Sequence, residues 1–182
     1  QFLRDVNLGI GFVAHADDAG NGLYKTVKAA GVVSYRVQIN PSFYMKGGIE
    51  AGWVQNRINW DELVFYDQIN PQYGTISPGG TPYPTEEVRP TDLNKSYLDL
   101  GFGLLAYSDR FYGGISVKHI NQPNQNFIET DNDLTEGLPM RASFTAGAQF
   151  PLRSNTIDGS DAFISPNVLF VVQGPFGQIN AG

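Results

Sequence analysis

The stretch from Arg110 to Phe127, RFYGGISVKHINQPNQNF, constrains the fold more than any other part of the sequence. From Tyr112 its residues alternate between two faces, which is the period of two of a β-strand with different surroundings on its two sides. The mixed face holds Tyr112, Gly114, Ser116, Lys118 and Ile120, and the mostly apolar face holds Phe111, Gly113, Ile115, Val117 and His119. Pro123 ends the pattern, because proline cannot donate a hydrogen bond to a strand ladder. On this pattern alone, a membrane barrel and a soluble sandwich both remain open.

The same alternation runs through most of the chain. We expect eight strands, namely this stretch and Leu3–Ala16, Thr26–Ile39, Phe43–Gln55, Ser96–Tyr107, Leu138–Phe150, Ala162–Gln173 and a last one from Phe176 onward. The cluster Asp17–Leu23 is expected to be a turn, since Gly and Asn adopt the positive φ angles of tight reversals. We therefore predict an antiparallel all-β fold with residues 1–182 as a single domain, a pattern that fits both a transmembrane outer-membrane β-barrel and a soluble sandwich.

Composition agrees with a barrel. The chain has 21 glycines, 12 phenylalanines and 9 tyrosines but only 16% charged residues, which is typical of transmembrane barrels. A mean hydropathy of −0.23 does not argue against this, because a transmembrane strand needs lipid-facing residues only at alternate positions. No run of about 18 apolar residues occurs, so no transmembrane helix is expected. The absence of cysteine excludes disulfides, and the net charge of −6 argues against a nucleic-acid surface.

Charged side chains fall on the faces that we infer to point inward. They are Lys28, Arg36, Lys46, Glu50 and Arg141. Two interpretations stay open at this point: an ion-pair network in a packed polar interior, or the lining of a wet channel.

Two connections are candidates for contact with partners. The stretch Asp67–Asn94 contains five prolines, and irregular stretches of this length are often functional. Gln122–Glu136 is the second, and loops on a rigid scaffold are where binding usually occurs. Within these loops we expect partner contacts at Tyr73, Tyr83, Glu86, Glu87, Arg89, Asn121, Gln122, Asn124 and Gln125.

No catalytic, metal or cofactor site is expected. Ser116 and His119 are three apart on one strand, so they should point to opposite faces and cannot pair as nucleophile and base. We expect His119 at the membrane rim, where it donates to a turn carbonyl. The acidic residues Glu129, Asp131, Asp133 and Glu136 do not have the spacing of a calcium-binding EF-hand loop, so a solvated acidic loop is the preferred interpretation.

The exact residues of three segments indicate a protein family, which periodicity alone cannot do. Gly113–Phe127 (GGISVKHINQPNQNF), Asn59–Ile69 (NWDELVFYDQI) and Ile164–Gly177 (ISPNVLFVVQGPFG) resemble, in this order, segments of the PorP/SprF family of the Bacteroidota type IX secretion and gliding system. Leu8–Gly20 partly follows a further segment of that family. The family's opening turn and its last strands have no counterpart here, so we expect a partial barrel.

The resemblance implies a larger barrel in the outer membrane of a Gram-negative, Bacteroidota-like cell. It implies a non-enzymatic protein that supports type IX secretion and the surface attachment of adhesin-like cargo. The partners it implies are secreted cargo with a type IX C-terminal domain, other secretion or gliding components and outer-membrane lipid. A general diffusion porin or small-solute channel is the alternative function.

Overall fold

A single antiparallel sheet dominates the structure, which is a computed structural model that describes residues 2–3, 7–128, 137–152 and 162–182. Within these residues, nine strands form the sheet in the order β1-β2-β3-β4-β5-β6-β7-β10-β11, and β8 and β9 form a separate pair. The strands are β1 (Phe2–Leu3), β2 (Leu8–Ala19), β3 (Tyr24–Asn40), β4 (Phe43–Ile58), β5 (Asn94–Ser108), β6 (Phe111–Lys118), β7 (Arg141–Ala148), β8 (Phe150–Pro151), β9 (Phe163–Ile164), β10 (Asn167–Gln173) and β11 (Phe176–Ala181). All pairs are antiparallel, so the predicted all-β fold is confirmed.

The sheet has one apolar face, which we call the outer face. Register places Ile10, Val33, Ile49, Phe102 and Val117 side by side across five strands on this face. The exposed fractions of Phe12, Ile49 and Ile179 are 74%, 64% and 70%. Among the described residues only Ala30, Val54 and Val171 are buried apolar side chains. Exposure of so much apolar surface to water is unfavourable, and one apolar face on a sheet of this kind is the pattern of an outer-membrane β-barrel.

The opposite face, which we call the inner face, carries the polar and small residues. On β3, for example, Thr26, Lys28, Ala30 and Ser34 are less exposed than their neighbours Val27 and Val33. The alternation in the sequence therefore predicted correctly which residues share a face. No helix among the described residues is long and apolar enough to cross a membrane.

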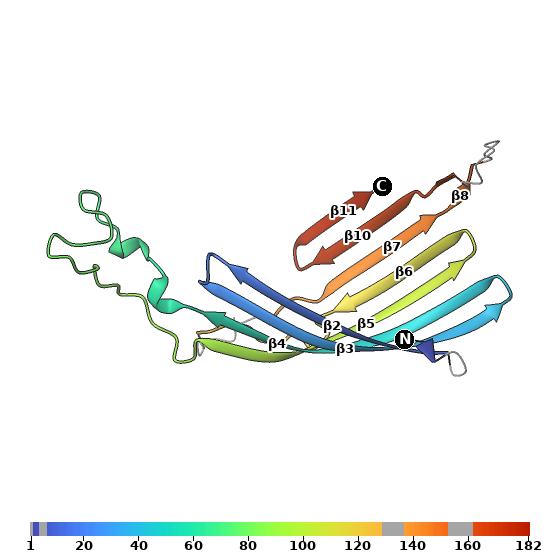
Figure 1. Cartoon of the computed structure of the whole chain (residues 1–182), viewed down its shortest axis with the longest axis horizontal. Coiled ribbons are helices and arrows are strands. Elements are labelled where there is room, and N and C mark those ends of the chain that lie inside the picture. The colour runs from blue at the N-terminus through green and yellow to red at the C-terminus, as the bar shows by residue number, and fades with distance from the viewer. Residues whose placement is uncertain (1, 4–6, 129–136, 153–161) are drawn as a thin grey trace.

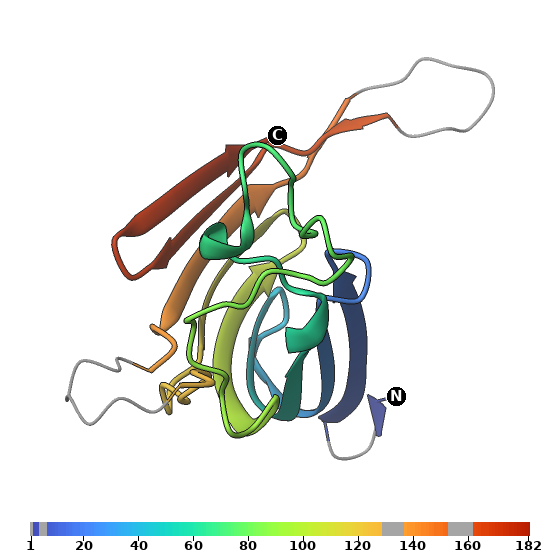
Figure 2. The same ribbon diagram turned by 90° about the vertical axis from the view of Figure 1, so that its left-hand side faces the viewer.

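The sheet is an open arc. β11 pairs only with β10, and β1 pairs only with β2, so no closed eight-stranded barrel exists in the part of the chain that the structure describes. Figure 2 shows the strands side by side along this arc. A larger barrel stays a prediction, and an unpaired edge in hydrocarbon would cost several kcal/mol for each N–H or C=O group.

Some predicted boundaries were wrong. Asp17–Ala19 belong to β2, and the turn is shorter than predicted. β6 ends at Lys118, before the predicted Ile120. β7 begins at Arg141, three residues after the predicted Leu138. The reasons for the early end of β6 lie in the hydrogen bonds of the segment that follows it.

The longest connection, residues 59–93, joins β4 to β5 and stands beyond the strand ends (Figure 1). It contains two short 3-10 helices, η2 (Trp60–Glu62) and η3 (Tyr66–Gln68). Because the strands alternate in direction, the connection from β6 to β7 leaves the sheet at this same end. The hairpins at Pro41–Ser42 and Asp109–Arg110 are at the opposite end, and so is the connection from β7 to β10, which contains β8 and β9.

We predict that a charge on the outer face destabilises the protein whereas a charge on the loop does not. Ile49→Arg in the full-length protein should lower the free energy of unfolding from lipid vesicles by about 2–4 kcal/mol, because the charge enters hydrocarbon. Val88→Arg is the matched control, since Val88 is similarly exposed at 70% but lies in the 59–93 loop. Urea titration of both variants measures the difference, and equal stabilities would contradict a lipid-facing outer face.

Candidate functional site

A cluster of ion pairs lies on the inner face and spans four strands. Lys28 Nζ on β3 lies 2.8 Å from Glu50 Oε1 on β4 and 2.9 Å from Asp99 Oδ2 on β5. Lys118 at the end of β6 reaches the same Glu50 at 3.4 Å. The Asp99 side chain is only 3% exposed. The ion-pair interpretation of the inner charges is therefore confirmed for Lys28 and Glu50.

Glycines make these long contacts possible. Lys28 is opposite Val54 in the ladder, whereas Asp99 is opposite Gly52, so the lysine must cross β4 diagonally. Lys28 Cε passes 3.3 Å from the position that a Cβ of Gly52 would occupy, and Ala30 Cβ is 3.0 Å from it. A side chain at position 52 would therefore push the lysine away from Asp99.

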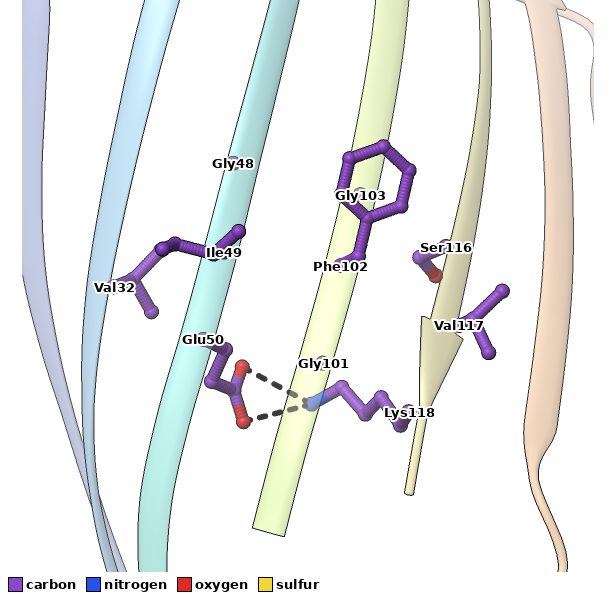
Figure 3. A pocket seen from close by; sticks show the side chains of 10 residues that line it. All are labelled: Val32, Gly48, Ile49, Glu50, Gly101, Phe102, Gly103, Ser116, Val117 and Lys118. Atoms are coloured by element: carbon purple, nitrogen blue, oxygen red, sulfur yellow. Dashed lines mark hydrogen bonds and ion pairs between the residues drawn. The ribbon is translucent and has the colours of Figure 1, made fainter. Parts of the chain in front are cut away.

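Gly101 has the same role for Lys118. Lys118, Gly101 and Glu50 are direct neighbours across three strands, so the lysine reaches Glu50 over the glycine. Figure 3 shows the ammonium and carboxylate groups meeting at Gly101. They border a hollow of about 180 Å³, and Val32, Gly48, Gly103 and Ser116 are among the residues that line it.

The position of His119 shows that two predictions from the sequence were wrong. Its backbone has a φ of 58°, and its Nδ1 atom lies 2.8 Å from Asp99 Oδ1. It therefore joins the inner cluster and does not bind a turn carbonyl at the rim, because the left-handed backbone rotates it out of strand alternation. Ser116 is on the inner face as well, so the two side chains are not on opposite faces as predicted. No hydrogen bond joins Ser116 to His119 among the described residues.

Asn121 continues the ladder of β5 beyond the end of β6. Its Nδ2 group donates to the carbonyl of Leu98 at 2.7 Å, and its Oδ1 atom accepts from the N–H of Leu100 at 3.1 Å. The N–H of Ile120 donates to the carbonyl of Leu100. The Asn121 side chain thus bonds the Leu98 carbonyl and the Leu100 N–H, which a longer β6 would otherwise have bonded. We call His119–Asn121 the latch, because it attaches the following segment to β5.

The 59–93 loop is held by its own polar contacts. Arg89 forms a bidentate ion pair with Asp61, at 2.7 and 3.2 Å. The carboxylate of Asp67 accepts hydrogen bonds from the N–H of Glu86 at 2.7 Å and from the hydroxyl of Thr85. These contacts connect the two 3-10 helices to the returning half of the loop.

Hydrogen bonds to the carboxylate of Asp67 lower the pKa of this residue. The N–H of Glu86 holds the pKa of this carboxyl below its ordinary value. Desolvation opposes this shift, and the Thr85 hydroxyl adds to it. Asp67 therefore stabilises the loop at neutral pH, where it is charged in both the folded and the unfolded chain. This contribution is lost as the pH falls through the lowered pKa.

The structure brings the two predicted docking loops together. Phe127 packs edge to face against Tyr24, with ring centroids 6.3 Å apart, and it lies beside Pro90 of the 59–93 loop. Hollows of about 520 and 380 Å³ separate the loop from residues 125–128. The two segments therefore form one surface, which the sequence alone could not show.

The predicted contact residues have different surroundings. Tyr73, Glu86 and Glu87 are exposed on the loop, whereas Tyr83 is half-buried and its carbonyl accepts from Gln68. Arg89 is paired with Asp61, as described above.

Residues of the second predicted set are mostly structural. Asn121 belongs to the latch, Gln122 turns the chain with a φ of 41°, and Asn124 accepts from the N–H of Asn126. Only Gln125 lines a hollow. Glu129, Asp131, Asp133 and Glu136 lie outside the described residues. No group of three or more His, Asp or Glu side chains within the described ranges could hold a metal ion.

Gly52 provides a test of the inner cluster. Gly52→Ala should lower the free energy of unfolding by about 1–3 kcal/mol, because the new methyl group overpacks the site against Ala30 and Lys28. Gly31→Ala is the matched control, since nothing lies within 4 Å of its missing Cβ and a change within about 0.5 kcal/mol is expected. Equal effects in a urea titration would show that the lysine does not depend on Gly52.

Asn121 provides a test of the latch. Asn121→Ala should destabilise the protein by about 0.5–1.5 kcal/mol, because two backbone groups of β5 lose their hydrogen-bond partner. The amide of Leu100 should also exchange with deuterium faster. Asn124→Ala is the control within the same segment, because Asn124 makes only a local contact with Asn126. An unchanged exchange rate at Leu100 in Asn121→Ala would contradict the latch.

The comparisons with known proteins agree with the resemblance seen in the sequence. A family model described as type IX secretion system membrane protein PorP/SprF matches residues 1–182, the whole chain. Searches of curated proteins and of solved structures found no match. The family is one of secretion-system membrane proteins and not a known enzyme family, and it implies interaction with other secretion components. The chain, an all-β protein with one apolar face, therefore belongs to the PorP/SprF family of type IX secretion system membrane proteins.

Proposed function

We propose that this chain forms part of a non-enzymatic outer-membrane barrel of Bacteroidota that supports type IX secretion and holds adhesin-like cargo at the cell surface. Cargo with a type IX C-terminal domain docks on the joined surface of the 59–93 loop and residues 125–128. One observation carries this proposal: two irregular segments lie side by side at the same end of a rigid sheet, and one of them is the longest connection in the chain.

The lengths of the loops indicate which end of the sheet faces out of the cell. Transmembrane barrels have short periplasmic turns and longer extracellular loops. The 59–93 loop and the β6–β7 connection are at one end of the sheet. The hairpins at Pro41–Ser42 and Asp109–Arg110 are at the other, together with the β7–β10 connection of residues 149–166, which is shorter than the 59–93 loop. The loop end accordingly faces outward, where secreted proteins arrive.

The inner face supports a scaffold more than a porin or an enzyme. Its central charges, Lys28, Glu50, Asp99 and Lys118, neutralise one another across the strands and so do not line an open water path. His119 has Asp99 as an orienting carboxylate, but no hydroxyl is hydrogen-bonded to His119 among the described residues. A base without a nucleophile in reach cannot begin covalent catalysis.

Deletion of residues 76–89 in the full-length protein tests the proposal. The strands and the latch remain in this variant, so barrel abundance, measured by heat modifiability on gels, should stay unchanged. Surface cargo, measured by flow cytometry of intact cells, should be lost. Undiminished surface cargo with a normal barrel would rule out docking by this loop.

Two epitope insertions provide the control for orientation. A tag between Gly79 and Gly80 should bind antibody on intact cells, whereas a tag after Ser42 should bind only after lysis. The reverse pattern would place the loop in the periplasm. Conductance of the purified protein in planar bilayers, without any co-purifying cargo, would favour the porin instead.

A further inference from the structure

Two adjoining hollows lie between the 59–93 loop and residues 125–128. The larger, of about 520 Å³, is lined by Trp60, Pro90, Phe127 and Ile128 among others. The smaller, of about 380 Å³, shares Pro90, Phe127 and Ile128, and its other lining residues are Val88, Arg89, Thr91, Asp92 and Lys95. Of the two cations, Arg89 is paired with Asp61. Val88 and Ile128 are 70% and 50% exposed. The two hollows together form a groove large enough for several apolar side chains of a partner.

The charge of the loop determines which partner fits this groove. Residues 59–93 contain six acidic side chains and one basic side chain, Arg89, so the segment has a net charge of −5 out of −6 for the chain. The acidic residues are Asp61, Glu62, Asp67, Glu86, Glu87 and Asp92. The rest of the chain is therefore nearly neutral in sum, and the negative potential is concentrated at this surface.

Only two of these six carboxylates are used to shape the loop. Asp61 pairs with Arg89, and Asp67 accepts from Thr85 and the Glu86 N–H. The remaining four, Glu62, Glu86, Glu87 and Asp92, are exposed, and their side chains have no ion pair or hydrogen bond among the described residues. Asp92 lines the smaller hollow itself.

We infer that this groove is the docking surface for a positively charged, apolar segment of a protein partner. The inference rests on the proposed function, because it specifies the chemistry of the partner's contact segment. Apolar side chains of the segment fill the hollows beside Pro90 and Phe127. Its lysine or arginine side chains pair with the free carboxylates around the groove, which raises the rate of association and selects against acidic segments.

Charge also selects a protein segment over a lipid surface or a nucleic acid. Anionic lipid head groups and phosphates are repelled by a surface with a net charge of −5, whereas cationic side chains are attracted. Because the free carboxylates are exposed, their attraction is screened by salt. Binding that depends on them therefore weakens as the salt concentration rises.

The test uses the full-length protein in detergent micelles and a short peptide that carries lysines and phenylalanines. The double variant Glu86→Lys/Glu87→Lys should weaken peptide binding by about tenfold or more at low salt. Both substitutions leave the backbone hydrogen bonds of the loop in place, since only the side chains change. Asp109→Lys, in the hairpin at the opposite end, is the matched control and should bind as the wild type does.

Three results would overturn the inference. The first is equal binding by the double variant and the wild type. The second is equal binding of a counterpart peptide with glutamates in place of lysines, which would show apolar recognition alone. The third is binding of anionic lipid vesicles that the basic peptide cannot displace.

The failure of this inference can be distinguished from the failure of the proposed function. If the basic peptide binds as expected but deletion of residues 76–89 leaves cargo on cells, the inference about the groove is supported and the proposal of cargo docking is contradicted. If the deletion removes cargo but the double variant binds the peptide normally, cargo docking stands and the charge inference fails.

Discussion

The contact of Lys28 with Asp99 across an intervening strand is the interaction on which the inner face depends. Asp99 is almost fully buried and binds Lys28 on one oxygen and His119 on the other. A buried carboxylate without partners is very unfavourable, so these contacts fix the relative positions of β3, β5 and the end of β6. Gly52 makes this possible, because any side chain there would occupy the path of the lysine.

The same contact connects the sheet to the loop end. His119 can reach Asp99 only because its backbone leaves the strand conformation, and this departure also ends β6. Asn121 then takes over the hydrogen bonds that β6 would have made with β5. The segment that continues to Phe127 is thereby directed toward the 59–93 loop. The charge cluster, the latch and the joined surface form one continuous arrangement.

The sequence predicted the strands and their faces because alternation directly reflects which side of the sheet is apolar. Ile49 and Glu50, for example, are neighbours with opposite environments in both the sequence and the structure. It could not predict which strands a side chain crosses, since the contact of Lys28 with Asp99 depends on a register set by long-range pairing. His119 was misplaced because alternation was extended past the residue where the backbone leaves the strand. The sequence also could not predict that Asn121 completes the hydrogen bonds of β5, because it does not show which backbone groups lack partners.

The two ends of this arrangement differ in how strongly their ion pairs hold them. The pair of Asp61 with Arg89 is 70% and 52% exposed on its two side chains, and exposed pairs of this kind contribute at most about 1 kcal/mol. The Lys28–Asp99 pair is 18% and 3% exposed, and loss of one partner of a buried pair costs about 3–5 kcal/mol. The loop is therefore the softer part, and its shape relies on contacts such as that of Asp67 with the Glu86 N–H. Changes in the shape of this acidic loop would therefore leave the buried pairs of the strands in place.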